Sequence, residues 1–290
     1  MKKTKYLLII ILLGIISIFT TACGTDKMDG IEIGVTNYAN EYVVSRLYGD
    51  HSTITSIYPD GVDTSSYKLS KKQKEEFANK EIFVYNGLIE AERNLAVDLL
   101  EINGSLKIID TAYVMETDYS PEELWLNPSS LLMMSQNVKN GLLEYIDSVY
   151  LQKDIEEKYN SLKIDLSNLD VEYRDAVKDT NNLNVVVDDS ALLYLEKFGL
   201  TVYCIDSSAT DKTIATVDDL MKNSQVNYII TFKNNDDSNN TSDFLNKYSG
   251  IKKMELHKLD NLTDDERDEK KDYLTIMEDN LTLLNQELYQ

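Results

Sequence analysis

The chain of 290 residues contains only two cysteines and two histidines. Two cysteines are too few for a disulfide-stabilised scaffold, an iron–sulfur protein or a zinc module built on cysteine. Two histidines are likewise too few for a metal site that depends on several imidazoles. These counts exclude the ligand sets that zinc most often uses in proteins.

Basic residues are also scarce, with 29 lysines and arginines against 50 aspartates and glutamates, which gives a formal net charge of −21. Proteins that bind nucleic acid need clustered positive charge to contact phosphates, so we expect no nucleic-acid partner. The hydrophobic fraction of 42% and the charged fraction of 27% are typical of a folded globular protein, and the length corresponds to about two domains.

Recognisable catalytic motifs are missing as well. The sequence contains no Gly-x-Ser-x-Gly elbow, no phosphate-binding glycine loop, no dinucleotide-binding glycine fingerprint and no His-Glu-x-x-His pair. We therefore predict that the protein is not an enzyme and that it uses no organic cofactor.

The N-terminus has the composition of an export signal. Three early lysines precede an apolar run over residues 6–19, which is shorter than the roughly 20 residues that a membrane-spanning helix needs. The run ends in Thr20-Thr21-Ala22-Cys23, which resembles a bacterial lipobox. We predict a lipoprotein signal peptide over 1–22, lipid on Cys23 and a tether over 23–30, with the protein on the outer face of the bacterial cell membrane. The alternative is an ordinary signal peptide with an incidental cysteine.

Short apolar runs rich in Val, Ile and Tyr alternate with segments of helical periodicity through the rest of the chain. Strands that alternate with helices predict parallel sheets covered by helices, an α/β fold with two lobes of about four strands each. The expected strands are 31–36, 53–58, 82–85 and 106–110 in the first lobe, and 184–187, 201–205, 228–232 and 253–256 in the second.

One long amphipathic helix is predicted over Leu151–Lys178, because apolar residues recur there every three or four positions without glycine or proline. A coiled-coil seam would show the same spacing, but flanking α/β units favour a helix that joins the two lobes. The predicted division is an N-terminal lobe over 31–150, a linking helix over 151–179 and a C-terminal lobe over 180–290. Pro128 is expected near the start of the preceding helix, and Asp264–Leu288 as one closing helix.

Five motifs follow one another along the chain: Gly61-Val62-Asp63 with Tyr67, Phe83 to Leu88 with Glu90, Trp125-Leu126-Asn127-Pro128, Ala191 and Tyr194 with Gly199-Leu200, and Tyr273-Leu274 with Met277 and Asn280-Leu281. In this order they resemble one family, the metal-ion substrate-binding lipoproteins of bacterial ABC importers. These are zinc and manganese receptors, some of which are also described as adhesins. The resemblance implies two lobes bridged by a rigid helix, a ligand in the cleft between them, an ABC permease as partner and a monomeric state.

The family's metal ligands are replaced in this chain. The resemblance implies that its three histidine ligands fall at Ser65, Glu123 and Asp189, and that its acidic fourth ligand falls near Asn234. The two histidines of this chain, His51 and His257, match no ligand position.

All four replacements offer oxygen. Zinc prefers imidazole and thiolate, whereas manganese, magnesium and calcium accept carboxylate, carbonyl and water oxygens. We therefore predict a divalent cation as the transported ligand, with manganese, zinc and calcium left open. Two alternatives also remain, in which metal binding is lost and the scaffold serves as a receptor for a non-metal solute or as a surface adhesion or interaction lipoprotein.

Overall fold

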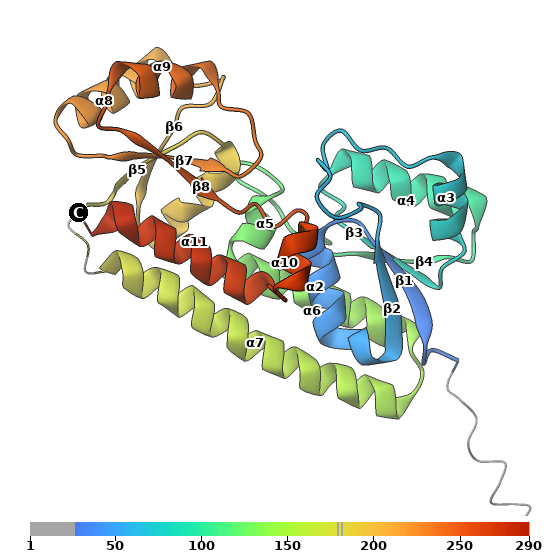
Figure 1. Ribbon diagram of the computed structural model, residues 1–290. Helices are drawn as coiled ribbons and strands as arrows, with labels where there is room; N and C mark the ends of the chain where they lie inside the picture. Colours follow the sequence, from blue (N-terminus) through green and yellow to red (C-terminus); the bar gives the residue numbers. More distant parts are fainter. Residues whose placement is uncertain (1–26, 179, 181, 290) are drawn as a thin grey trace, which may run out of the picture.

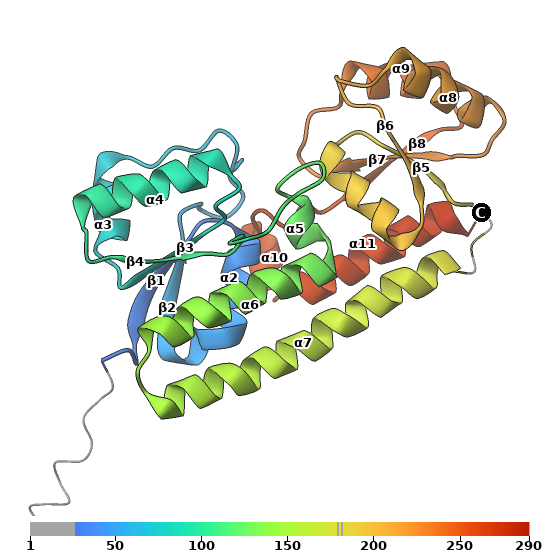
Figure 2. The same cartoon turned by 180° about the vertical axis from the view of Figure 1, so that it is seen from behind.

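The computed structural model describes residues 27–178, 180 and 182–289; the predicted signal peptide and Cys23 lie outside these ranges. Two lobes lie beside each other, and long helices run along one side of both (Figures 1 and 2). Each lobe contains one four-stranded parallel sheet with flanking helices, so the predicted fold class is confirmed.

The N-terminal sheet has the strand order β2-β1-β3-β4. Its central strand β3 is a continuous apolar run, and all four of its residues are buried because helices cover both faces of a parallel sheet. The sheet consists of β1 (Ile31–Val35), β2 (Ser52–Ser56), β3 (Ile82–Tyr85) and β4 (Lys107–Asp110), with helices α2 (Tyr38–Tyr48), α3 (Lys71–Ala78) and α4 (Glu90–Ile102) and a short 3₁₀ helix, η1 (Gly49–His51).

The C-terminal sheet repeats this topology in the order β6-β5-β7-β8. In both lobes the first crossover therefore runs to one side and the second to the other, which places a topological switch point between β1 and β3 and between β5 and β7. The elements are β5 (Asn184–Val187), η2 (Ser190–Phe198), β6 (Thr201–Cys204), α8 (Asp211–Lys222), β7 (Tyr228–Phe232), α9 (Asn239–Lys247) and β8 (Lys252–Leu256).

Three helices connect and support the lobes: α5 (Glu123–Leu126), α6 (Pro128–Tyr145) and α7 (Val149–Lys178). Pro128 occupies the first turn of α6, as expected, because proline has no N–H to lose there. Helix α7 has 30 residues, corresponding to about 45 Å, and the apolar positions predicted from its periodicity are buried. These residues belong to one continuous core that includes β1 and β3 of one lobe and β5 and β7 of the other.

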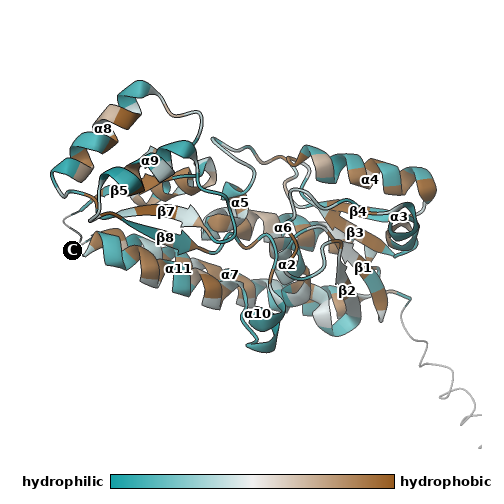
Figure 3. Cartoon of the chain, turned by 45° about the horizontal axis from the view of Figure 1, so that its top comes forward, coloured by the Kyte–Doolittle hydropathy of each residue, from teal (hydrophilic) through white to brown (hydrophobic). Residues whose placement is uncertain are grey.

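The predicted single helix over Asp264–Leu288 is wrong. The structure has a short helix, α10 (Asp264–Asp268), and a longer one, α11 (Tyr273–Leu288), with Lys270 in the left-handed backbone region at φ 55° between them. Two capping residues explain the break, because the Thr263 and Asp272 side chains each accept a backbone N–H at the start of one helix. The α10 segment is hydrophilic throughout (Figure 3) and has no apolar face to extend α11 along α7.

Cys204 lies at the end of β6 as a free, half-buried thiol. Burial raises its pKa to about 12, which leaves the thiol protonated and unreactive at neutral pH. Within the described ranges, no helix is long and apolar enough to cross a membrane.

Candidate ligand-binding cleft between the lobes

Polar residues follow the strands at the switch points of both sheets. In open parallel sheets, ligands bind beyond the carboxyl ends of the strands at such points. Strands β1 and β3 lead into Thr36 and Asn86, whereas β5 leads into Asp188 and Asp189. The two lobes use these positions differently.

The switch point of the N-terminal sheet is filled by Glu92 of α4. Its Oε2 accepts hydrogen bonds from Thr36 Oγ1 at 2.5 Å and from the Asn86 amide at 2.7 Å. Its Oε1 accepts one from Asn37 Nδ2 at 3.2 Å. Burial raises the pKa of Glu92 to about 7, although these hydrogen bonds oppose the shift. This carboxyl group links the ends of β1 and β3, and its Oε2 already accepts two hydrogen bonds.

The switch point of the C-terminal sheet presents two aspartates. Asp189 caps η2, with its Oδ1 accepting from the Ala191 amide at 2.9 Å. Its Oδ2 accepts a longer hydrogen bond from Asn235 Nδ2 at 3.4 Å. Asp188 Oδ2 accepts from the Ser238 amide at 2.8 Å, while its Oδ1 is buried and has no hydrogen-bond partner in the described structure.

A cleft of about 530 Å³ lies where a loop of the N-terminal lobe meets the loops that follow β7 and β8. The lobes touch directly at its edge, because the Gly61 amide donates to the Leu262 carbonyl at 2.8 Å and Thr64 Oγ1 donates to Asp260 Oδ2 at 2.8 Å. The lining residues are Gly61, Val62, Asp63, Lys233, Asn234, Asn235, His257, Lys258, Asp260, Asn261, Leu262, Thr263 and Glu266.

Two of the predicted ligands lie at or beside this cleft. Asn234 lines it and has φ 64°, a left-handed conformation that asparagine tolerates better than most residues. Ser65 is exposed, and its amide and hydroxyl both donate to Asp63 Oδ1, at 2.9 and 2.7 Å. The hydroxyl and amide groups of Ser65 and the hydroxyl of Ser66 hold the pKa of Asp63 below its usual range.

Glu123, at the start of α5, is fully buried. Its Oε1 accepts from the Asp118 amide at 2.9 Å and lies 3.5 Å from Lys197 Nζ, while its Oε2 has no hydrogen-bond partner among the described residues. The adjacent Glu122 pairs with Lys258 at 3.5 Å. Two lysines of the C-terminal lobe therefore pair with consecutive glutamates at the start of α5.

The structure brings the predicted ligands together only in part. No hydrogen bond joins any two of Ser65, Glu123, Asp189 and Asn234, although Asp189 contacts Asn235, the neighbour of Asn234. Across residues 27–178, 180 and 182–289, no three His, Cys, Asp or Glu side chains form a group that could hold a metal ion.

Sequence reasoning missed Asp260, Lys197 and Lys258. Asp260 was detectable in principle, because it follows β8 at the carboxyl edge of the sheet, as Asn234 follows β7. No sequence pattern indicated the two lysines, because each pairs with a glutamate that is far away in the sequence.

The two histidines have structural contacts. His51 lies between Asp29, at 2.9 Å from Nδ1, and Asp154, at 3.2 Å from Nε2. His257 lines the cleft but is buried; its Nδ1 accepts from the Leu259 amide, and its Nε2 faces Glu266 Oε2 at 3.3 Å. Burial lowers the pKa of His257, although Glu266 opposes the shift, so the ring is neutral near pH 7.

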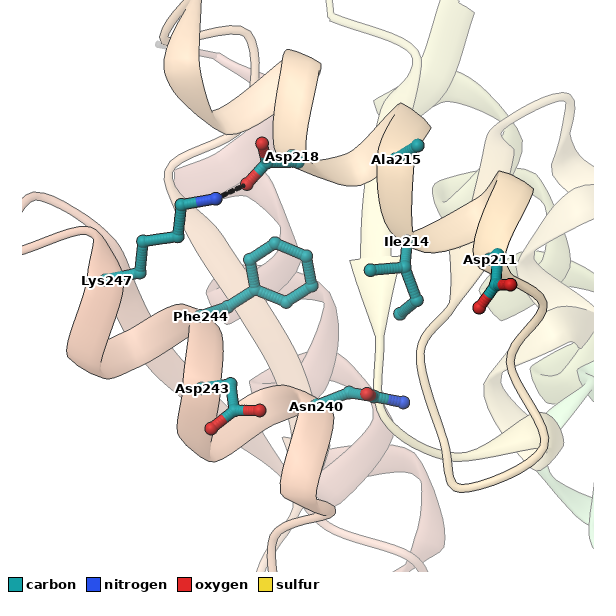
Figure 4. Close-up of a pocket in the computed structure, with 8 residues that line it drawn as sticks. All are labelled: Asp211, Ile214, Ala215, Asp218, Asn240, Asp243, Phe244 and Lys247. Atoms are coloured by element: carbon teal, nitrogen blue, oxygen red, sulfur yellow. Dashed lines mark hydrogen bonds and ion pairs between the residues drawn. The ribbon is translucent and has the colours of Figure 1, made fainter.

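A second hollow of about 360 Å³ lies between α8 and α9 on the outer face of the C-terminal lobe (Figure 4). Phe244 and Ile214 form its apolar floor, and Lys247 pairs with Asp218 at its rim. This hollow contains no predicted ligand residue.

Comparison with known proteins agrees with this architecture. The family model described as zinc-uptake complex component A, periplasmic, matches residues 33–287. The zinc-binding lipoprotein AdcA of Streptococcus pneumoniae is 23% identical over 99% of this chain, and the match covers 61% of AdcA. The chain thus spans about three fifths of that relative's length.

Solved structures share the fold. The crystal structure of the Zn(II)-bound ZnuA-like domain of S. pneumoniae AdcA superposes with a TM-score of 0.73 at 21% identity, covering 90% of this chain and 100% of that domain. The metal-dependent lipoprotein YcdH of Bacillus subtilis gives a TM-score of 0.74 at 19% identity, with 90% and 100% covered. Because the family model extends over most of the sequence, the chain belongs to the family of zinc-uptake complex component A.

Proposed function

We propose that this protein captures a divalent metal ion in the cleft between its lobes and delivers it to an ABC permease. The observation that carries the proposal is the meeting of oxygen-bearing side chains from both lobes at the carboxyl ends of the two sheets, in a chain of this family. A cation bound between the lobes would take ligands from both lobes, so its binding would stabilise the contact between them.

The proposed ligands are Ser65, Glu123, Asp189 and Asn234, of which Asn234 lines the cleft, with Asp260 as an additional carboxylate in its lining. This set offers oxygen only. Replacing imidazole by carboxylate and neutral oxygen removes much of zinc's usual advantage over manganese, so zinc should lose more affinity than manganese or calcium. Zinc, manganese and calcium are the candidate ions.

We further propose that Cys23 carries the lipid that holds the protein at the outer face of the cell membrane, and that the protein works as a monomer. In this arrangement the 31–150 and 180–290 lobes hold the ligand, and the 151–179 segment connects them. The role is binding and delivery, without catalysis.

Calorimetric titration of the purified protein with Mn²⁺, Zn²⁺ and Ca²⁺ tests the proposal. Glu123→Gln and Asp189→Asn should each weaken binding at least about tenfold, because each removes an anionic ligand. Asp243→Asn is the matched control, since Asp243 is exposed on α9 at the outer hollow. Binding should also weaken toward acid pH, because carboxylate ligands must be deprotonated.

Two outcomes would contradict this proposal in different ways. Tight zinc binding that survives both carboxylate substitutions would show that the cation sits elsewhere. Absence of heat and of thermal stabilisation with every ion would remove the metal-receptor function itself.

A further inference from the structure

The carboxylate of Glu123 is only half satisfied. The side chain is fully buried, and Oε1 accepts from the Asp118 amide at 2.9 Å, yet the buried Oε2 has no hydrogen-bond partner in the described structure. A buried carboxylate oxygen without a partner is energetically costly. Glu123 therefore has one buried oxygen whose cost a further donor or a cation would remove.

The charge of this carboxylate is already balanced by an ammonium group from the other lobe. Lys197, in the last turn of η2, places its Nζ 3.5 Å from Glu123 Oε1 and 3.8 Å from Asp118 Oδ2. The lysine side chain is 36% exposed whereas the glutamate side chain is 0% exposed. When it leaves, the ammonium group can therefore be hydrated, whereas the carboxylate stays buried and needs another cation in its place.

A second contact fixes this end of η2 against the same segment. Tyr119 OH donates to Glu196 Oε2 at 2.5 Å, one residue before the lysine. This hydrogen bond joins the end of η2 to the loop before α5 and does not involve Lys197.

A divalent cation and the Lys197 ammonium cannot both bind closely to the buried carboxylate of Glu123. Two positive charges within about 4 Å repel each other strongly in a partly desolvated site. We propose that Lys197 is an internal competitor for the cation: it neutralises Glu123 in the metal-free protein and must withdraw when a divalent ion binds. This inference rests on the proposed function, with Glu123 as a ligand, and it makes Lys197 the residue that sets how strongly Glu123 holds a cation.

Removing the ammonium group tests the competition. Lys197→Met should tighten binding of both Mn²⁺ and Zn²⁺ by about tenfold or more, and by similar factors, because the change is in charge and not in ligand type. Lys197→Gln should act in the same direction and serves as a second variant if the methionine form folds poorly. Lys247→Met is the matched control: it removes the same charge at the outer hollow, away from the cleft, and should leave both affinities unchanged.

Thermal unfolding provides a second readout. In the presence of a chelator, Lys197→Met should melt at a lower temperature than the parent protein, because Glu123 loses its counter-ion. Added Mn²⁺ should then raise the melting temperature more in the variant than in the parent. The double variant Lys197→Met/Glu123→Gln should lose the gain in affinity.

The outcomes separate this inference from the function on which it rests. If the parent protein binds a cation and Glu123→Gln weakens binding, but Lys197→Met and Lys197→Gln do not tighten it, the competition is refuted and the receptor function stands. If neither parent nor variants bind any divalent ion, both are refuted. Binding that emerges only in the lysine variants would support the competition.

Discussion

Glu92 and Glu123 are both buried carboxylates, but their surroundings differ. Glu92 accepts three hydrogen bonds from groups at the ends of β1 and β3. Glu123 has one backbone donor, one lysine and an oxygen without a partner in the described structure. A fully hydrogen-bonded carboxylate stabilises the strand ends, whereas a partly satisfied one is available for a ligand. Residue type alone does not distinguish the two roles.

The raised pKa of Glu92, about 7 compared with 4.5 for an unperturbed glutamate, predicts a pH dependence of stability. Between pH 4.5 and 7 the folded state holds a proton that the unfolded state has lost, so the free energy of unfolding should fall as pH rises through this range. Glu287 has a pKa raised to about 7, also mainly by burial, and adds to the same slope. Carboxylates with a lowered pKa, such as Asp63, act at more acid pH, whereas His257, whose pKa is lowered from 6.5 by burial, opposes this slope below pH 6.5. Urea unfolding at several pH values measures the slope.

Glu92→Gln should reduce this slope, because glutamine does not titrate in the range. It should also lower stability at acid pH, since one amide oxygen replaces two acceptors. Glu90→Gln, at an exposed position of the same helix, is the control and should leave the slope as it is. An undiminished slope in Glu92→Gln would assign the effect to other groups.

At the scale of elements, the connecting helix determines how the two lobes share a core. Helix α7 buries residues against α6 and α2 on the N-terminal side and against α11 and η2 on the C-terminal side. The OH group of Tyr173 donates to the Met277 carbonyl of α11 at 2.9 Å. The charged face of α7 is exposed, which explains why its sequence is amphipathic and not apolar all round.

Truncation of a buried leucine in this helix should be costly. Leu162 is fully buried and Leu166 is 1% exposed, so changing either to alanine should lower the free energy of unfolding by about 2–5 kcal/mol through lost apolar contact and the cavity that remains. Ile164, 61% exposed on the opposite face, is the control, and Ile164→Ala should change stability by less than about 0.5 kcal/mol. Equal effects at all three positions in urea unfolding would contradict the assigned face.

At the scale of the whole molecule, the lobes meet through polar contacts around the cleft in addition to their shared core. Arg267 of α10 forms a two-pronged ion pair with Glu41 of α2 and also contacts Asp60 at 3.0 Å. Lys258 and Lys197 of the C-terminal lobe pair with Glu122 and Glu123 at the start of α5. Such contacts are partly exposed, so each contributes modestly, and a ligand in the cleft can rearrange them.

The proposed tether adds a prediction about the intact protein in a bacterial cell. Cys23→Ser should abolish incorporation of labelled fatty acid and release the protein from the membrane fraction, or leave it attached only through an uncleaved signal segment. Cys204→Ser is the matched control, because it removes the other cysteine while Cys23 remains. Label that persists in Cys23→Ser would refute lipid attachment at this position.

Local periodicity determined most of the architecture. Apolar runs of strand length, the three- and four-residue spacing along α7 and the family motifs are readable in sequence because they depend on neighbours within a turn or a strand. The same reasoning joined α10 to α11 wrongly, since it gave acidic residues and helical spacing more weight than the capping residues Thr263 and Asp272.

The tertiary structure alone decided which polar side chains meet at the strand ends and between the lobes. The pairing of Lys197 with Glu123, the position of Asp260 beside Thr64 and the hydrogen bonds of Glu92 all join residues that are distant in the sequence. Which charge neutralises which carboxylate depends on how the two sheets are placed by α7 and on which side chains burial leaves within reach. No repeat or spacing records such pairings, because the distances that fix them arise only when the lobes pack.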